Sequence, residues 1–116
     1  MKIETELRPG NRAVVRPIGQ VDADSASDLK AALKQAADGG AERVAVDLEQ
    51  VDFIDSSGLS ALVSGLKLLR LKGGTLSLSR PRPQAMTALR LTMLDRVFGI
   101  FPSVEEALQK MDTPDL

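Results

Sequence analysis

The side chains available for chemistry in this chain are carboxylates, amines, guanidiniums and hydroxyls, because it contains no His and no Cys. Without an imidazole or a thiol, a single chain cannot build a Ser-His-Asp or Cys-His nucleophile, a disulfide, a redox thiol or a zinc site of nitrogen and sulfur ligands. The sequence also lacks a glycine-rich phosphate-binding loop. We therefore expect no metal, no nucleotide and no other cofactor bound to this chain, and we do not expect an enzyme.

The most informative polar cluster is Asp55-Ser56-Ser57-Gly58. It lies between an expected strand at 43–48 and the start of an expected helix at 57–72, where free helix amides favour anionic groups. A serine here could cap the helix and remain accessible, and a phosphate on it would add about −1.5 to −2 charges at neutral pH. Local chemistry alone leaves two interpretations open, a modification switch or a set of capping residues.

Two further groups of residues are candidates for a function. Asp47, Asp52 and Asp55 are candidates for general acids or bases, but no electrophile-binding group accompanies them at a recognisable spacing. The second group is an apolar strip that could dock a partner but is more often part of a core, and it consists of Leu91, Met93, Leu94, Val97 and Phe98. We therefore expect no catalysis from the first group and a core role for the second.

The chain has 116 residues and a mass of 12.4 kDa, which is the size of one domain. Hydrophobic residues make up 43% and charged residues 27% of it, as is typical of a domain with its own core. We assign 1–111 to this domain and 112–116 to a short C-terminal tail. The net charge of −1 and the presence of only 3 aromatic residues, all Phe, argue against a nucleic-acid partner.

The N-terminal third of the chain predicts a hairpin followed by a helix. Residues 3–7 alternate apolar with polar side chains, residues 13–18 are rich in β-branched side chains, and a Pro-Gly-Asn turn signal separates them. Apolar residues recur at helical spacing over 24–37, with Asp24 or Ser25 as the cap and two glycines at the end. The hairpin strands are expected to pair in antiparallel fashion.

The rest of the chain alternates strands with helices. Strands at 43–48 and 75–79 flank the helix at 57–72, and this order with short links predicts a parallel pair. The remaining expected elements are a helix at 84–91, a short edge strand at 97–101 and a last helix at 104–111, which Ser103 begins and which packs on the sheet. The predicted fold class is α/β, a single domain with a mixed β-sheet and about four helices.

Four segments, in this order, resemble the bacterial anti-sigma factor antagonists of the STAS-domain family. They are Gly19-Gln20-Val21-Asp22, Val46-Asp47-Leu48, Phe53-Ile54-Asp55-Ser56-Ser57-Gly58-Leu59 and Lys72-Gly73-Gly74. The resemblance covers nearly the whole chain and implies a STAS fold. It also implies a binding module that works by partner switching in the cytoplasm.

In such a switch, as the resemblance implies, the unphosphorylated antagonist binds a cognate anti-sigma factor, a serine kinase of GHKL type, and frees the sigma factor. The kinase then phosphorylates the first hydroxyl after the Asp, which is Ser56 here, and a phosphatase reverses this. The expected partner-binding residues are Gln20, Asp22, Asp55, Ser57 and Gly58. Gln20 departs from the family's usual acidic residue at its position, whereas Asp22 matches.

The alternative is a non-catalytic STAS accessory subunit of a lipid or anion transport complex, or of a stressosome, because the same fold serves there by resemblance. No window approaches the 18 uninterrupted apolar residues of a membrane span, and the first residues carry no signal-like apolar run. We therefore expect a cytoplasmic protein without membrane insertion. Recovery of an anti-sigma protein or of transport subunits in a pull-down would separate the two hypotheses.

Overall fold

The two N-terminal strands pair as their sequence alternation predicts. In the computed structural model, which describes residues 1–110, strands β1 (Lys2–Arg8) and β2 (Arg12–Val21) are antiparallel. Gly10 and Asn11 at the turn have φ angles of 85° and 57°, a left-handed conformation that these two residue types adopt readily. The expected tail at 112–116 and the last residue of the final helix, Met111, lie outside the described residues.

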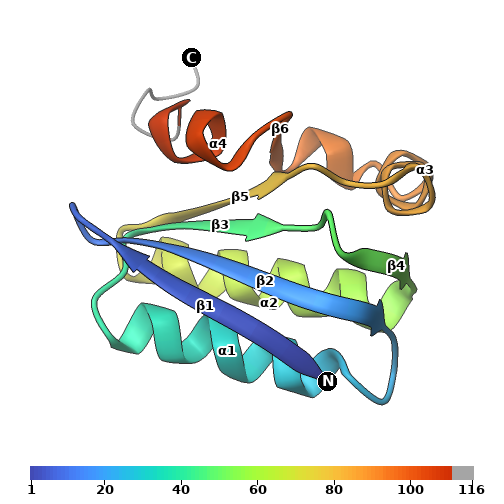
Figure 1. Cartoon of the computed structure of the whole chain (residues 1–116), viewed down its shortest axis with the longest axis horizontal. Coiled ribbons are helices and arrows are strands. Elements are labelled where there is room, and N and C mark those ends of the chain that lie inside the picture. The colour runs from blue at the N-terminus through green and yellow to red at the C-terminus, as the bar shows by residue number, and fades with distance from the viewer. Residues whose placement is uncertain (111–116) are drawn as a thin grey trace.

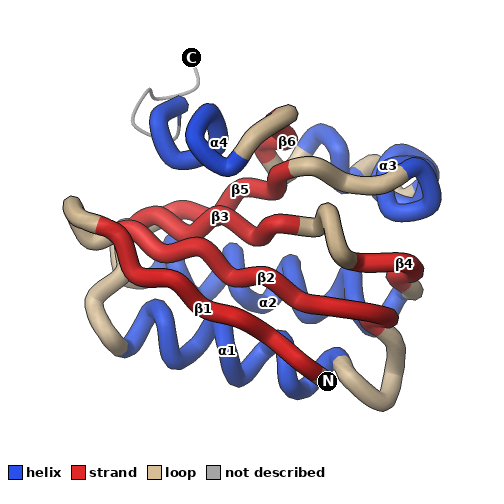
Figure 2. Tube along the Cα trace, in the orientation of Figure 1, coloured by secondary structure: helices blue, strands red, loops and turns tan. Residues whose placement is uncertain are grey.

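The remaining strands add to β2 in parallel (Figures 1 and 2). Strand β3 (Arg43–Asp47) pairs with β2, β5 (Thr75–Ser79) pairs with β3, and β6 (Gly99–Phe101) pairs with β5. The order along the sheet is therefore β1-β2-β3-β5-β6. Two predictions are confirmed: the parallel pairing of the strands that precede and follow the long helix in the sequence, and the edge strand near the C-terminus.

The fourth strand, β4 (Val51–Ile54), lies between the expected strand at 43–48 and the expected helix at 57–72, where the sequence predicted no further element. It pairs in parallel with the carboxyl-terminal half of β2, beyond the point where β3 ends, as Figure 2 shows. With four residues, of which the middle two are exposed, it has too little alternation to be recognised as a strand. Its consequence is that the cluster around Ser56 follows β4 and not β3.

Helices cover both faces of the sheet. Helices α1 (Ala26–Asp38) and α2 (Ser56–Leu71) run side by side on one face, and α4 (Val104–Lys110) packs on the other (Figure 1). Helix α3 (Pro83–Leu91) lies against β4 and is followed by a short 3-10 helix, η1 (Leu94–Arg96). Ser103 Oγ accepts a hydrogen bond from the Glu106 N–H at 3.1 Å, so the predicted cap of α4 is confirmed.

Alternating side chains divide the apolar residues of the sheet between two clusters. Val15 of β2 and Val46 of β3 face α1 and α2 in the main core, whereas Val14 and Ala45 face α4 in a smaller one. All four are fully buried. The mixed sheet with four helices thus agrees with the predicted fold class.

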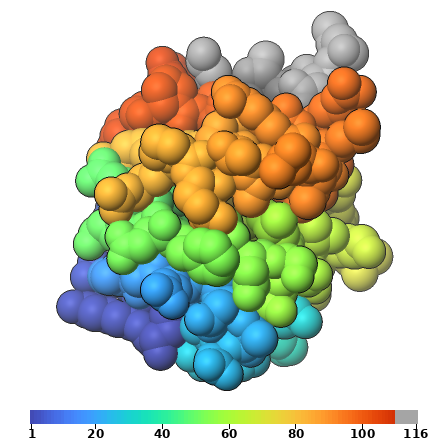
Figure 3. Space-filling model, turned by 90° about the vertical axis from the view of Figure 1, so that its right-hand side faces the viewer, coloured from blue at the N-terminus to red at the C-terminus, as the bar shows by residue number. Residues whose placement is uncertain are grey.

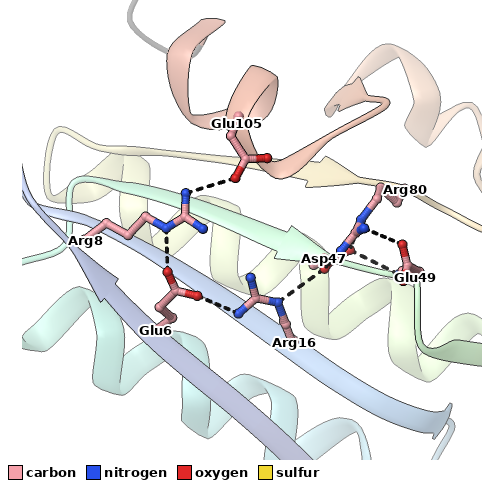
Figure 4. Close-up of polar contacts among 7 residues, drawn as sticks. All are labelled: Glu6, Arg8, Arg16, Asp47, Glu49, Arg80 and Glu105. Atoms are coloured by element: carbon pink, nitrogen blue, oxygen red, sulfur yellow. Dashed lines mark hydrogen bonds and ion pairs between the residues drawn. The ribbon is translucent and has the colours of Figure 1, made fainter.

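Asp47 at the end of β3 is buried, with a side chain 2% exposed, and is the centre of a charge network (Figure 4). Arg80 donates to both of its carboxylate oxygens, from Nη2 at 2.6 Å and from Nε at 3.2 Å, and this bonding raises the pKa of Arg80. Arg16 Nε lies 3.4 Å from Oδ2, and the network continues through Glu6 to Arg8. These contacts give Asp47 a structural role that ties β1, β2, β3 and the end of β5 together.

Asp38 at the end of α1 is expected to make the protein sensitive to acid. Its carboxylate accepts from Lys34 Nζ at 2.6 Å and from Lys72 Nζ at 2.7 Å, and these bonds lower its pKa from 3.8 to about 2. A carboxyl group whose pKa is lower in the folded than in the unfolded state stabilises the fold at any pH above its unfolded pKa. This stabilisation is lost as the pH falls through the folded pKa. The thermal midpoint should therefore decrease as the pH is lowered from about 4 to about 2. Asp38→Asn should reduce this decrease in a plot of thermal midpoint against pH. An unchanged curve in the variant would contradict the assignment.

Candidate functional site

Asp55 follows β4 directly and caps α2. Its backbone is extended, with φ −107° and ψ −170°, and its Oδ1 accepts the N–H groups of Ser57 at 2.9 Å and Gly58 at 3.1 Å. The expectation that a serine could cap this helix is wrong, because the carboxylate already takes the free amides and α2 begins one residue earlier, at Ser56. Ser56 is exposed and Ser57 is half-buried, so the hydroxyl of Ser56 is the more accessible.

Gly58 allows α2 to begin directly against the end of β2. A Cβ at this position would lie 2.6 Å from the Val21 carbonyl oxygen and 2.6 Å from Ile54 Cγ1. The same Val21 carbonyl accepts the Asp55 N–H at 3.2 Å. The absence of a side chain at Gly58 thus brings the segment after β2 and the first turn of α2 together.

Asp22 organises residues 22–25, the loop between β2 and α1, which is called the Asp22 loop. Its Oδ1 accepts the N–H groups of Asp24 at 3.0 Å and Ser25 at 3.2 Å. Ser25 stands at the N-cap position of α1, but its hydroxyl points back, donating to the Gln20 carbonyl at 2.7 Å and accepting the Asp22 N–H at 3.0 Å. The predicted capping of α1 by a side chain of Asp24 or Ser25 is therefore wrong, and the loop is held by Asp22 instead.

The expected site residues lie at the end of the sheet where β2 and β4 finish. Val21 and Ile54 pair at the ends of β2 and β4, which places Asp22 and Asp55 side by side as the next residues of each strand. In Figure 3, which faces this edge, the blue residues after β2 adjoin the green residues around the start of α2. Gln20 is exposed on β2, whereas Gly58 is buried and contributes close packing only.

Two hollows that were not predicted from the sequence flank Ser56 and Ser57. One of about 340 Å³ lies between α1 and α2 and is lined by Ala23, Ala26, Ser27, Lys30, Ser57 and Ser60. The other, of about 380 Å³, has Ser56 at its rim and runs along α2 toward the segment after α3. The spacing of Ser56, Ser60 and Ser64 by four residues was the available signal, since it places the three hydroxyls on one face of a helix.

The apolar strip near the end of α3 is largely at the surface, so the expected core role is wrong for most of it. Leu91 is 81% exposed, Met93 63% and Val97 44%. Only Phe98 is buried, and Leu94 is half-buried in the second hollow. The reason is that α3 ends at Leu91 and Met93 takes a left-handed conformation with φ 61°, which breaks the helical spacing.

A supporting residue that the sequence reasoning missed is Gln84 of α3. Its side-chain amide bonds both backbone groups of Ile54, the residue before Asp55. No local sequence signal marks such a contact, because the two residues are 30 positions apart. Arg82, next to it, pairs with Asp52 of β4 at 2.9 Å.

Comparison with known proteins identifies the family of this chain. The sequence model of the STAS domain family matches residues 2–107. The chain belongs to the STAS domain family. A Thermotoga maritima relative is 32% identical over 72 residues, which span 62% of this chain and 64% of that relative. The anti-sigma-B factor antagonist of Bacillus subtilis is 26% identical over 110 residues, spanning 94% of this chain and 100% of that protein.

Solved STAS structures share the fold. The anti-sigma factor antagonist SpoIIAA in its unphosphorylated form superposes with a TM-score of 0.82 at 21% identity, covering 99% of this chain and 100% of that chain. Its phosphorylated form from Bacillus superposes with a TM-score of 0.73 at 21% identity, covering 94% of this chain and 98% of that chain. Within the described part of this STAS chain, no helix has the length and apolarity needed to cross a membrane.

Proposed function

We propose that this STAS domain is an anti-sigma factor antagonist. In its unphosphorylated form it binds a cognate anti-sigma factor, a serine kinase of GHKL type, and so releases a sigma factor in the cytoplasm. Phosphorylation of Ser56 by that kinase ends the binding, and a phosphatase restores it. The names of the relatives support the antagonist role, and the geometry around Ser56 supports the switch.

The observation that carries this proposal is the exposed Ser56 on the first turn of α2, beside the Asp22 loop. Asp55 holds the helix amides, so Ser56 is not required as a cap and its hydroxyl can be modified without unravelling the helix. The Asp22 loop next to it supplies a second, rigid contact. A partner that contacts both the Asp22 loop and the first turn of α2 would bind differently when Ser56 is modified.

A phosphate on Ser56 would act on the partner more than on the fold. The start of α2 offers a favourable dipole to a negative charge, which partly offsets repulsion from Asp55 within the domain. In the complex, the dianion would have to be desolvated against the partner surface. The free domain therefore stays folded while the complex weakens.

A pull-down from a bacterial lysate with the unphosphorylated protein tests the proposal. Recovery of a small kinase-like anti-sigma factor, together with phosphorylation of the antagonist when ATP is added, is the expected result. Recovery of membrane transport subunits and no kinase would instead support the accessory-subunit hypothesis. The two outcomes are distinguished by identifying the captured proteins by mass spectrometry.

Asp22→Ala is expected to weaken partner binding and also to lower stability. The Asp22 carboxylate bonds two backbone amides just before α1, so removing it costs a loop contact as well as a charge at the proposed partner surface. Loss of such a capping interaction costs about 1 kcal/mol. Thermal unfolding and calorimetric titration with the anti-sigma factor measure the two effects. Asp22→Asn is the control, because its amide oxygen can still accept both bonds, so it should recover stability more than binding.

A further inference from the structure

Gln84 of α3 holds the backbone just before the candidate site. Its Nε2 donates to the Ile54 carbonyl at 3.0 Å, and its Oε1 accepts the Ile54 N–H at 2.9 Å. A single side-chain amide therefore satisfies both backbone groups of one residue. This is the pairing that a neighbouring strand would otherwise provide.

The need for this pairing follows from the sheet topology. In a parallel strand, successive residues direct their backbone groups to opposite sides. The Asp55 N–H points to β2, where it bonds the Val21 carbonyl at 3.2 Å, so the groups of Ile54 point away from β2. Among the described strands β4 pairs with β2 alone, and α3 lies along its other edge. Gln84 thus takes the place of the missing strand at Ile54.

The contact fixes the site from the side opposite to β2. Ile54 is bonded by Gln84, and the next residue, Asp55, is bonded to β2 and caps α2. Ser56 follows directly. A shift of Ile54 would therefore move the Asp55 cap and the hydroxyl of Ser56 together.

We propose that Gln84 is a positioning residue for the phosphorylation of Ser56. This inference rests on the proposed function, since it concerns how the same site is presented to the kinase. The side-chain hydrogen bonds that Gln84 makes among the described residues go to Ile54, so it acts on Ser56 through Ile54 and Asp55. The neighbouring pair of Arg82 and Asp52 has exposed side chains, and such surface pairs contribute little, so it does not replace Gln84.

Gln84→Leu tests the proposal, because it keeps a side chain of similar bulk and removes both hydrogen bonds. The amide of Ile54 should exchange its hydrogen faster with solvent, since it loses its acceptor. The kcat for phosphorylation of Ser56 should fall about tenfold, because a displaced hydroxyl reacts more slowly. The KM should change much less, since the Asp22 loop remains in place.

Two variants serve as controls. Gln84→Glu keeps an acceptor for the Ile54 N–H but cannot donate to the Ile54 carbonyl when ionised, so it should give an intermediate kcat. Thr87→Ala, at an exposed position of the same helix, should leave exchange and kinetics unchanged. All measurements are made well below the thermal midpoint of each variant, so that a general loss of stability does not alter kcat.

The outcomes separate this inference from the proposed function. Faster exchange at Ile54 with a lowered kcat supports the positioning role. Unchanged exchange, or faster exchange with the kinetics of Thr87→Ala, overturns it even though the wild type is a substrate. If the wild type neither binds an anti-sigma factor nor is phosphorylated, the proposed function fails and the positioning role for phosphorylation fails with it.

Discussion

Ser56→Asp is expected to weaken binding to the anti-sigma factor by about thirtyfold, which corresponds to about 2 kcal/mol. The substituted carboxylate would lie next to Asp55 at the edge where the partner is proposed to bind, so binding would bring a second negative charge out of water. Ser56→Ala should bind like the unphosphorylated wild type, because the Asp55 cap does not involve the Ser56 side chain. Calorimetric titration of both variants with the anti-sigma factor measures the difference.

Phosphorylation of the same proteins identifies the modified hydroxyl. With the anti-sigma factor kinase and ATP, the wild type should carry phosphate on Ser56, and Ser56→Ala should carry none. Ser57→Ala is the matched control, because Ser57 is the neighbouring half-buried hydroxyl and should not be needed as an acceptor of phosphate. Phosphate mapped to Ser57, or equal affinities of Ser56→Asp and Ser56→Ala, would contradict the assignment.

The long elements could be predicted because their patterns reflect burial on one face. The residues of β2 alternate between the two cores, and the buried leucines of α2 recur at helical spacing. Strand β4 has four residues and its edge is completed by a glutamine from a distant helix, so no local pattern marks it. Its position depends on tertiary contacts that the sequence does not display.

The place of the candidate site in the fold was predictable from the sequence, but its contacts were not. Asp22 and Ser56 both follow strands, and the pairing of Val21 with Ile54 places Asp22 beside Asp55, the residue before Ser56. Capping by Asp55 was one of the two interpretations that the sequence left open, whereas the backward bonds of Ser25 were not expected. Several oxygens compete for the same amides, and only the loop geometry decides between them. The exposure of Met93 depends likewise on one backbone angle.

Gly58→Ala is expected to lower both stability and partner binding. The added Cβ would lie 2.6 Å from the Val21 carbonyl oxygen, and because this is backbone, β2 and α2 must separate. Such overpacking costs about 1–3 kcal/mol, which exceeds the helix-propensity gain of up to about 1 kcal/mol for Gly to Ala. Gly65→Ala on the same helix is the matched control. The atoms that its Cβ would meet belong to the side chains of Leu33 and Leu76 and not to backbone, so it should lose less stability than Gly58→Ala.

The separation caused by Gly58→Ala would also move Ser56 away from the Asp22 loop, since the approach of α2 to Val21 holds the two segments together. Binding measured far below the thermal midpoint should therefore weaken for Gly58→Ala and stay near wild type for Gly65→Ala. Equal thermal midpoints for the two variants would show that α2 does not depend on a close approach at Gly58. Unchanged binding by a destabilised Gly58→Ala would show instead that the partner does not need the Asp22 loop and the start of α2 to lie side by side.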